Sequence, residues 1–164
     1  MKITLVTIGK IKERWWNDAI AEYGRRLGRY CTLQILEAPD EATPDSASRA
    51  EEAQILRREG ERVLKLIERC SAAGSTRIIA LAIEGKMYDS VSFADHLDRL
   101  QVSGSSHLVF VIGGSLGLSE QVLRSAHEKI SFSKMTFPHQ MMRVIALEQI
   151  YRAFRITRNE PYHK

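Results

Sequence analysis

The feature that most constrains the fold of this chain is a regular alternation of short apolar runs with longer stretches of helical periodicity. Strands that alternate with helices are typical of an α/β domain built on a largely parallel sheet. In such a sheet, ligands bind beyond the carboxyl ends of the strands. The runs with the length and apolar content of strands are Ile3 to Ile8, Thr32 to Leu36, Arg77 to Ile83, Leu108 to Ile112 and Ile130 to Phe132.

The segments between these runs carry helix signals. From Glu13 to Leu27, the residues Trp16, Ile20 and Tyr23 recur at helical spacing, so we expect one apolar stripe on the sheet and tryptophans in the core.

Two further helix starts are readable. Ser48 and Glu51 have the spacing of a capping box, and the helix that they begin is expected to end near Gly74. Ser92 and Asp95 are the expected start of the next short helix.

Length and composition indicate one soluble domain. A chain of 164 residues suits a single hydrophobic core, so we expect one domain over residues 1–164. Met1 to Gly9 lacks the pattern of a signal peptide, and no apolar stretch approaches the roughly 20 residues that cross a membrane. Cys31 and Cys70 lie far apart without a CxxC pattern, which predicts reduced thiols and no metal site. A cytoplasmic protein without membrane association is expected.

The net charge of +4 is concentrated near the C-terminus. Beyond Ser133 there are six basic residues against two acidic ones, which accounts for the whole surplus. A basic end suits a phosphate-bearing partner such as RNA, although a solvated helix face explains the same charge. The six basic residues are Lys134, Arg143, Arg152, Arg155, Arg158 and Lys164.

Three segments follow the carboxyl ends of predicted strands and form the expected ligand site: Glu84 to Lys86, Gly113 to Ser119 and Ser133 to Pro138. The middle segment contains three glycines, which let the backbone approach a ligand closely, and Ser119 is positioned to cap the helix that opens at Glu120.

The glycine segment permits several interpretations. Gly113, Ser115 and Gly117 match a hydrolase nucleophile elbow, for which Glu148 and His163 are the available partners. A dinucleotide site is a second interpretation, but the spacing differs from G-x-G-x-x-G and the loop follows the fourth strand. A tight turn between strand and helix is the third.

Longer blocks decide between these interpretations by resemblance. The chain reads FVIGGSLGL from Phe110 to Leu118, SFSKMTFPHQMMR from Ser131 to Arg143, and EQIYRAF from Glu148 to Phe154. It opens with KITLVTIGKIKE, carries Glu22, Tyr23, Arg25 and Arg26, and ends with Pro161, Tyr162, His163 and Lys164. Over its whole length the chain resembles the ribosomal RNA large-subunit pseudouridine N3-methyltransferase family of the SPOUT class.

One departure from the family pattern is Asn159, which stands before the terminal Pro-Tyr-His motif where the family often has glycine. Asparagine tolerates the left-handed backbone region better than most residues, so the turn is expected to survive.

The resemblance implies a single-domain SPOUT-type parallel-sheet fold with a C-terminal trefoil knot, and a homodimer. Two apolar stripes on the final helix agree with a second partner, although a helix buried at the centre of a monomer would show them too. One stripe contains Val144, Leu147, Tyr151 and Phe154, and the other contains Met142, Ala146, Ile150 and Ala153.

The resemblance further implies S-adenosylmethionine as methyl donor, with no metal, and ribosomal RNA within the assembled ribosome as substrate. Cofactor contacts carried onto this sequence are Leu81, Gly113, Phe132, Ser133, Lys134, Met135, Thr136 and Phe137. Apolar contacts and backbone groups suffice to hold the adenine and methionine parts, and Pro138 helps to fix the loop. At least one of the aromatic residues is expected to be ordinary core.

Methylation of pseudouridine N3 requires removal of an imino proton and stabilisation of the resulting charge. His163 is the expected base, because an unperturbed histidine is mostly neutral near pH 7. Arg152 and Lys164 are expected to stabilise the anion or a flanking phosphate, and Tyr162 to contact the base. His139 is expected to be a helix-start residue.

Two residues outside this set are candidates for phosphate contacts, Arg155 and Arg158. A non-catalytic RNA-binding module is the competing class of function. Binding of S-adenosylmethionine separates the two classes.

Overall fold

All five strands of the protein form one sheet. The computed structural model describes residues 1–71 and 75–164, so the expected helix end at Gly74 lies outside the described residues. The spatial order is β2-β1-β4-β3-β5, and every neighbouring pair is parallel, which confirms the predicted α/β architecture. The strands are β1 (Lys2–Ile8), β2 (Thr32–Ala38), β3 (Thr76–Met87), β4 (His107–Ile112) and β5 (Glu128–Ser131).

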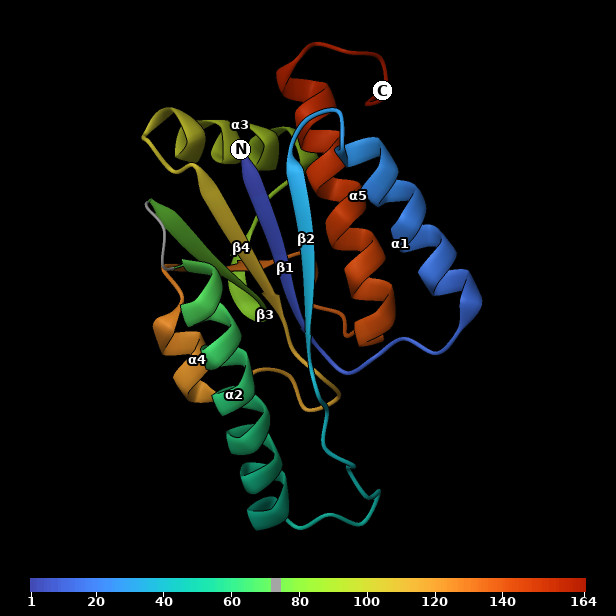
Figure 1. Cartoon of the computed structure of the whole chain (residues 1–164), viewed down its shortest axis with the longest axis vertical. Coiled ribbons are helices and arrows are strands. Elements are labelled where there is room, and N and C mark those ends of the chain that lie inside the picture. Colours follow the sequence, from blue (N-terminus) through green and yellow to red (C-terminus); the bar gives the residue numbers. More distant parts are fainter. Residues whose placement is uncertain (72–74) are drawn as a thin grey trace.

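Helices cover both faces of the sheet (Figure 1). One face packs against α1, α3 and α5, and the other against α2 and α4. Two hydrophobic cores result, one on each side. The helices are α1 (Arg14–Leu27), α2 (Arg49–Ser71), α3 (Ser90–Val102), α4 (Glu120–Ser125) and α5 (His139–Thr157).

Strand β1, which lies between β2 and β4, contributes side chains to both cores. Ile3 and Leu5 belong to the core beneath α1, α3 and α5, whereas Val6 and Ile8 belong to the core beneath α2 and α4. A parallel sheet covered on both faces favours strands that are apolar at most positions, as β4 is, whereas β1 also carries the buried polar residues Thr4 and Thr7.

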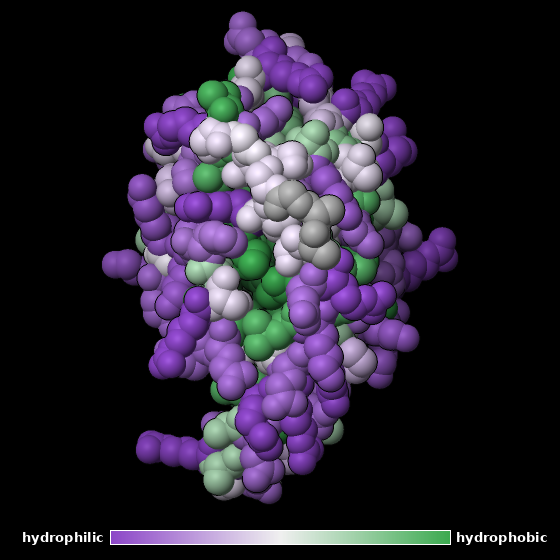
Figure 2. Space-filling view, turned by 60° about the vertical axis from the view of Figure 1, so that its left-hand side comes forward, coloured by the Kyte–Doolittle hydropathy of each residue, from purple (hydrophilic) through white to green (hydrophobic). Residues whose placement is uncertain are grey.

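Helix α2 begins as predicted. The Ser48 backbone N–H donates to the Glu51 carboxylate over 2.7 Å, and the Glu51 N–H donates to the Ser48 hydroxyl over 3.3 Å. The first turns of α2 extend past the sheet at the bottom of Figure 1, and Figure 2 shows mainly hydrophilic side chains there. The same view shows one hydrophobic patch near the centre of the molecule.

Three local predictions are wrong. Trp15 is 64% exposed, so it does not belong to the core, although Leu27 of the same helix is fully buried. Helix α3 is capped by Asp89, whose carboxylate accepts the Ser92 N–H over 2.7 Å, and not by Ser92. The expected loop Glu84 to Lys86 belongs to β3, which continues to Met87.

Helix α5 is surrounded within its own chain. It packs against α1 on one side, α3 on the other, and β4 beneath. Both apolar stripes are thereby covered, so they give no support for a dimer. The trefoil knot implied by the resemblance stays a prediction. Within the described part of the chain, no helix is both long and apolar enough to span a bilayer.

Candidate active site

A cavity of about 760 Å³ lies at the carboxyl ends of β3, β4 and β5. This is the edge of the sheet at which the rule for open α/β sheets predicts a ligand, and the volume is typical of a small-molecule site. The lining consists of residues 81–84, 112–118, 130–133 and 135–140, together with Leu123 and Met142. All three of the expected segments contribute to it.

The glycine segment forms both a tight turn and a wall of the cavity. The Gly117 N–H donates to the Gly114 carbonyl over 3.1 Å, and Gly117 has a φ of 82°. A Cβ at Gly113 would lie 2.3 Å from the backbone of Gly117, so no side chain fits there. Ser119 caps α4 as predicted by accepting the Val122 N–H.

A bulge in β3 shapes the opposite wall. Leu81 pairs with Ile130, and after the bulge Lys86 pairs with Ile130 again, so the intervening residues leave the ladder. Ala82, Ile83 and Glu84 reach the cavity in this way.

Seven of the eight residues that the resemblance implies for the cofactor line this cavity: Leu81, Gly113, Phe132, Ser133, Met135, Thr136 and Phe137. Lys134 is exposed and does not line it. Phe132 also packs edge-on against Phe93 at 5.7 Å, so one aromatic residue belongs to the core, as expected.

The start of α5 closes the cavity and is held by a buried arginine. His139 is the first residue of the helix, as predicted, and it lines the cavity. Burial, and then the charge of Arg143, lower the pKa of His139. The Arg143 guanidinium donates to the carbonyls of Ile8 and Gly9 over 2.8 and 2.7 Å, and to Glu37 over 2.7 Å. This side chain therefore ties the first turns of α5 to the carboxyl ends of β1 and β2.

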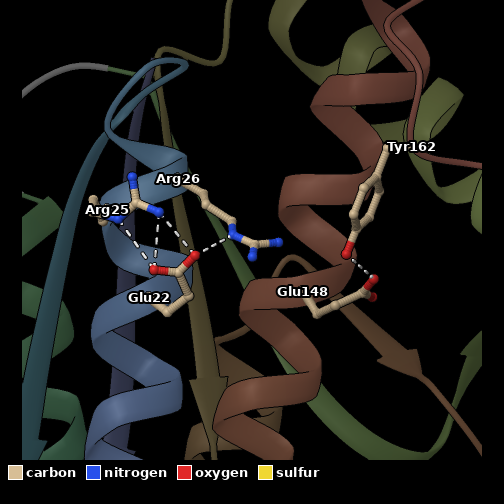
Figure 3. A network of polar contacts seen from close by, with 5 residues as sticks. All are labelled: Glu22, Arg25, Arg26, Glu148 and Tyr162. Atoms are coloured by element: carbon tan, nitrogen blue, oxygen red, sulfur yellow. Dashed lines mark hydrogen bonds and ion pairs between the residues drawn. The ribbon is translucent and has the colours of Figure 1, made fainter.

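The four residues expected to act on the substrate lie near the other end of α5. The Tyr162 hydroxyl donates to Glu148 over 3.1 Å (Figure 3), and the Arg152 guanidinium lies 4.6 Å from the centre of the Tyr162 ring. Arg152 also donates to Glu148 over 3.0 Å and lies 3.3 Å from His163 Nδ1. Lys164 follows as an exposed residue. The structure thus gathers Arg152, Tyr162 and His163.

Electrostatics keep Tyr162 protonated. Burial, followed by hydrogen bonds with Tyr23 and Glu148, raises the pKa of Tyr162. Its hydroxyl is therefore a donor to Glu148 at neutral pH. Because both the hydroxyl and the ring are engaged inside the chain, the role of Tyr162 is better described as anchoring the tail.

Sequence reasoning missed the supporting residues of this cluster. Arg26 projects from α1 between Glu22 and the α5 side (Figure 3), and it donates to Glu22 over 2.7 Å. Its guanidinium lies 5.8 Å from the Tyr151 ring. The spacing of Glu148 and Arg152 on one helix face was the available signal for Glu148.

The cavity lies at the start of α5, whereas the cluster of Arg152, Tyr162 and His163 lies toward the end of that helix. We call these three residues the tail cluster. Arg152 contacts His163 and lies 13 positions after His139 at the cavity, which corresponds to about 20 Å along α5 at 1.5 Å per residue. Figure 1 shows the C-terminus near the start of β1, at the edge of the sheet away from the glycine segment. Ser115 contacts Thr43 at 3.4 Å, and Glu148 and His163 are both bound to Arg152, so the nucleophile-elbow interpretation is wrong.

Three of the six basic C-terminal residues form ion pairs within the fold, but only the pair with Glu37 lowers the surplus, from +4 to +3, because Glu148 and Glu160 are the two acids already counted. Arg143 pairs with Glu37, Arg152 with Glu148, and Arg155 with Glu160. Both cysteines are free and half-buried, and burial raises the pKa of Cys31 to about 11. Among residues 1–71 and 75–164, no group of three His, Cys, Asp or Glu side chains is placed to hold a metal ion.

Comparison with known proteins decides what this arrangement belongs to. A sequence profile described as a predicted SPOUT methyltransferase matches residues 1–163. The chain belongs to the SPOUT methyltransferase family. This SPOUT methyltransferase is 54% identical to a protein of Exiguobacterium sibiricum and 55% identical to one of Bifidobacterium adolescentis, over 164 residues and the whole of each chain. Both relatives are named ribosomal RNA large subunit methyltransferase H.

Solved structures agree on the fold of this SPOUT methyltransferase. A probable methylase family protein from Haemophilus influenzae matches with a TM-score of 0.58 at 15% identity, covering 99% of this chain and 70% of that one. A probable methyltransferase from Bordetella pertussis matches with a TM-score of 0.55 at 14% identity, covering 93% of each chain.

Proposed function

We propose that the protein methylates N3 of a pseudouridine in large-subunit (23S) ribosomal RNA, with S-adenosylmethionine as the donor and the assembled ribosome in the cytoplasm as its substrate. The observation that carries this proposal is full-length identity above 50% to relatives named as ribosomal RNA large subunit methyltransferases. The name of those relatives supports large-subunit ribosomal RNA as the substrate. The choice of pseudouridine as the modified nucleotide rests on the family resemblance.

The cavity fits the proposed donor. The glycine segment, Ser133, Met135 and Thr136 line this cavity together with the apolar side chains of Leu81, Phe132 and Phe137, which suits a ligand with an aromatic base and a short zwitterionic arm. When bound there, S-adenosylmethionine supplies a methyl group already activated by its sulfonium. The chain must then place the nucleophilic nitrogen in line and take its proton.

In this proposal the tail cluster orients the nucleobase nitrogen and takes its proton. A guanidinium has donors alone, so His163 Nδ1 accepts from Arg152 and the neutral ring carries its proton on Nε2. As negative charge develops on the nucleobase, Arg152 turns its hydrogen bond to the base, and Nδ1 becomes free to take the N3 proton. Lys164 adds a positive charge for the base or a flanking phosphate.

The distance between tail and cavity favours a homodimer in which the tail of one subunit completes the cavity of its partner. His163 is held on Arg152, about 20 Å along α5 from His139 at the cavity of the same chain, so it could reach that cavity only by leaving this position. Exposed apolar residues are available for the interface, including Trp15 on α1 at 64% exposure and Met135 at the cavity at 72%.

Two variants of the purified protein test the proposal. Deleting Tyr162 to Lys164 is expected to leave binding of S-adenosylmethionine unchanged by calorimetry and to abolish methyl transfer to ribosomes. Gly113→Ala is expected to abolish binding of the donor, because the added Cβ would overlap the Gly117 backbone.

Gly24→Ala serves as the matched control, since a Cβ at this helix position meets Leu33 at an ordinary 3.6 Å. Full activity of the truncated protein would refute the role of the tail. A folded, unaltered chain that binds no S-adenosylmethionine would refute the enzyme and favour a non-catalytic RNA-binding module.

A further inference from the structure

The turn between α5 and the C-terminal tail is held by two backbone hydrogen bonds. The Glu160 N–H donates to the Arg155 carbonyl over 2.8 Å, and the Asn159 N–H donates to the Ile156 carbonyl over 2.9 Å. Asn159 has a φ of 53°, in the left-handed region. These are the two hydrogen bonds of a Schellman motif. Asn159 adopts the left-handed conformation that glycine usually has in this motif, so the turn is preserved, as predicted.

One side chain then ties this turn to the rest of the protein. The Arg155 guanidinium contacts the Glu160 carboxylate at 2.8 Å and donates to the Pro161 carbonyl over 2.6 Å. It also donates to the Tyr30 hydroxyl over 3.1 Å, and that hydroxyl donates to Glu160 over 2.5 Å. We call Arg155, Tyr30 and Glu160 the tail latch.

The tail latch has a rigid support. Tyr30 lies in the turn between α1 and β2, and its ring stacks on Phe154 at 5.4 Å and packs edge-on against Tyr151 at 5.9 Å. Three separate parts of the chain therefore meet at Arg155: helix α5, the α1–β2 turn and the tail. Fixing Pro161 in this way sets the direction of the residues that follow.

Of the residues that follow, Tyr162 anchors the tail, and His163 and Lys164 are the ones proposed to act on the substrate. Tyr162 immediately after Pro161 packs against Tyr151 at 4.9 Å, and His163 then lies 3.3 Å from Arg152. Ordering a free chain end costs about 1–2 kcal/mol per residue at the moment of binding. A tail that is already ordered avoids that cost when the RNA arrives.

The environment of Arg155 argues against the phosphate contact expected from the sequence. Its side chain is 19% exposed, and both of its terminal nitrogens are used by Tyr30, Glu160 and Pro161. The Nε atom is buried and has no hydrogen-bond partner among the described residues. A phosphate could reach this guanidinium only by breaking the tail latch.

We propose that Arg155, acting with Tyr30 and Glu160, is a positioning residue that holds the C-terminal tail ready so that His163 meets the substrate in one orientation. The proposal rests on the proposed function, because the tail has a reacting partner only if the chain is a methyltransferase. It concerns the order of the tail itself, which is measurable without any reaction.

The test uses the full-length enzyme with Arg155→Lys, Glu160→Gln and Tyr30→Phe. Arg155→Lys keeps the charge but not the forked geometry, so kcat for ribosomes is expected to fall about 10- to 100-fold, the effect of a small misplacement. The KM for ribosomes and the Kd for S-adenosylmethionine are expected to stay within about twofold, since neither is set by an interaction that the change removes. Arg124→Lys is the matched control, because Arg124 forms an exposed pair with Glu120 at 3.2 Å on α4.

A second measurement reports the tail directly. Carboxypeptidase should release Lys164 and His163 from native Arg155→Lys and Glu160→Gln at least about tenfold faster than from the unaltered chain. A raised KM with unchanged kcat would overturn the proposal in favour of a phosphate contact, and unchanged release rates would overturn it altogether. If the unaltered chain transfers no methyl group, the proposed function fails, and the release rates still decide whether the tail latch exists.

Discussion

Arg143 is a buried residue whose side chain connects three elements of the fold. It is 1% exposed and lies among the largest fully buried side chains of the described residues. Its hydrogen bonds join α5 to the carboxyl ends of β1 and β2, next to the cavity. Burial lowers the pKa of Arg143, and the hydrogen bond that Arg143 donates to Glu37 partly opposes this effect.

Arg143→Met is expected to lower the free energy of unfolding by about 1–3 kcal/mol for each of the two buried carbonyls, of Ile8 and Gly9, that lose their donor. Urea denaturation measures the loss. Arg124→Met, at a side chain that is 76% exposed, should stay within about 0.5 kcal/mol of the unaltered protein. A loss below about 1 kcal/mol for Arg143→Met would mean that solvent replaces these hydrogen bonds.

At the scale of elements, Gly60 allows α2 to pack closely against the start of α4. A Cβ at Gly60 would lie 2.2 Å from the Ser119 hydroxyl and 2.8 Å from its Cβ. Ser119 caps α4 and directly follows the glycine segment, so this crossing fixes one wall of the cavity. The absence of a side chain at Gly60 is therefore a packing requirement.

Gly60→Ala is expected to destabilise the protein by about 1–3 kcal/mol through overpacking, despite the better helix propensity of alanine. Combining it with Ser119→Gly should recover most of the loss, since glycine is nearly as good a cap and removes the clashing atoms. A double-mutant cycle by urea denaturation gives the coupling. Strictly additive effects of the two changes would show that the helices do not meet there.

At the scale of the whole molecule, the two candidate sites are complementary but displaced. The cavity proposed for the donor lies at the carboxyl ends of the strands, and the cationic tail lies toward the other edge of the sheet. In a dimer with two-fold symmetry, every contact between the two subunits occurs twice. Such a dimer would place the tail of each chain at the cavity of its partner.

Co-expression of two defective chains with different tags tests this arrangement. One chain carries Gly113→Ala, and the other lacks Tyr162 to Lys164. In the purified mixed dimer one of two sites is intact, so about half of the unaltered activity is expected. Each defective homodimer is the control and should be inactive. A mixed dimer that is equally inactive would place tail and cavity function within one chain.

The sequence by itself determined the architecture and the three segments around the cavity, because both follow from local patterns and the rule for parallel sheets, whereas the individual cofactor residues came from the family resemblance. The alternation of apolar runs and helical segments predicted the parallel sheet, and seven of eight implied cofactor residues line one cavity. Ser48 and Ser119 were readable as helix caps because a cap is a contact over three residues.

Tertiary structure alone decided which charges are available and which side chains are buried. Arg143 and Arg155 look alike in a basic segment, yet one is buried against β1 and the other is closed into the tail latch. Trp15 is exposed because α1 covers the sheet with one face only. Such outcomes depend on partners more than 100 residues away, such as Glu37 for Arg143 and Tyr30 for Arg155, and no local spacing encodes them.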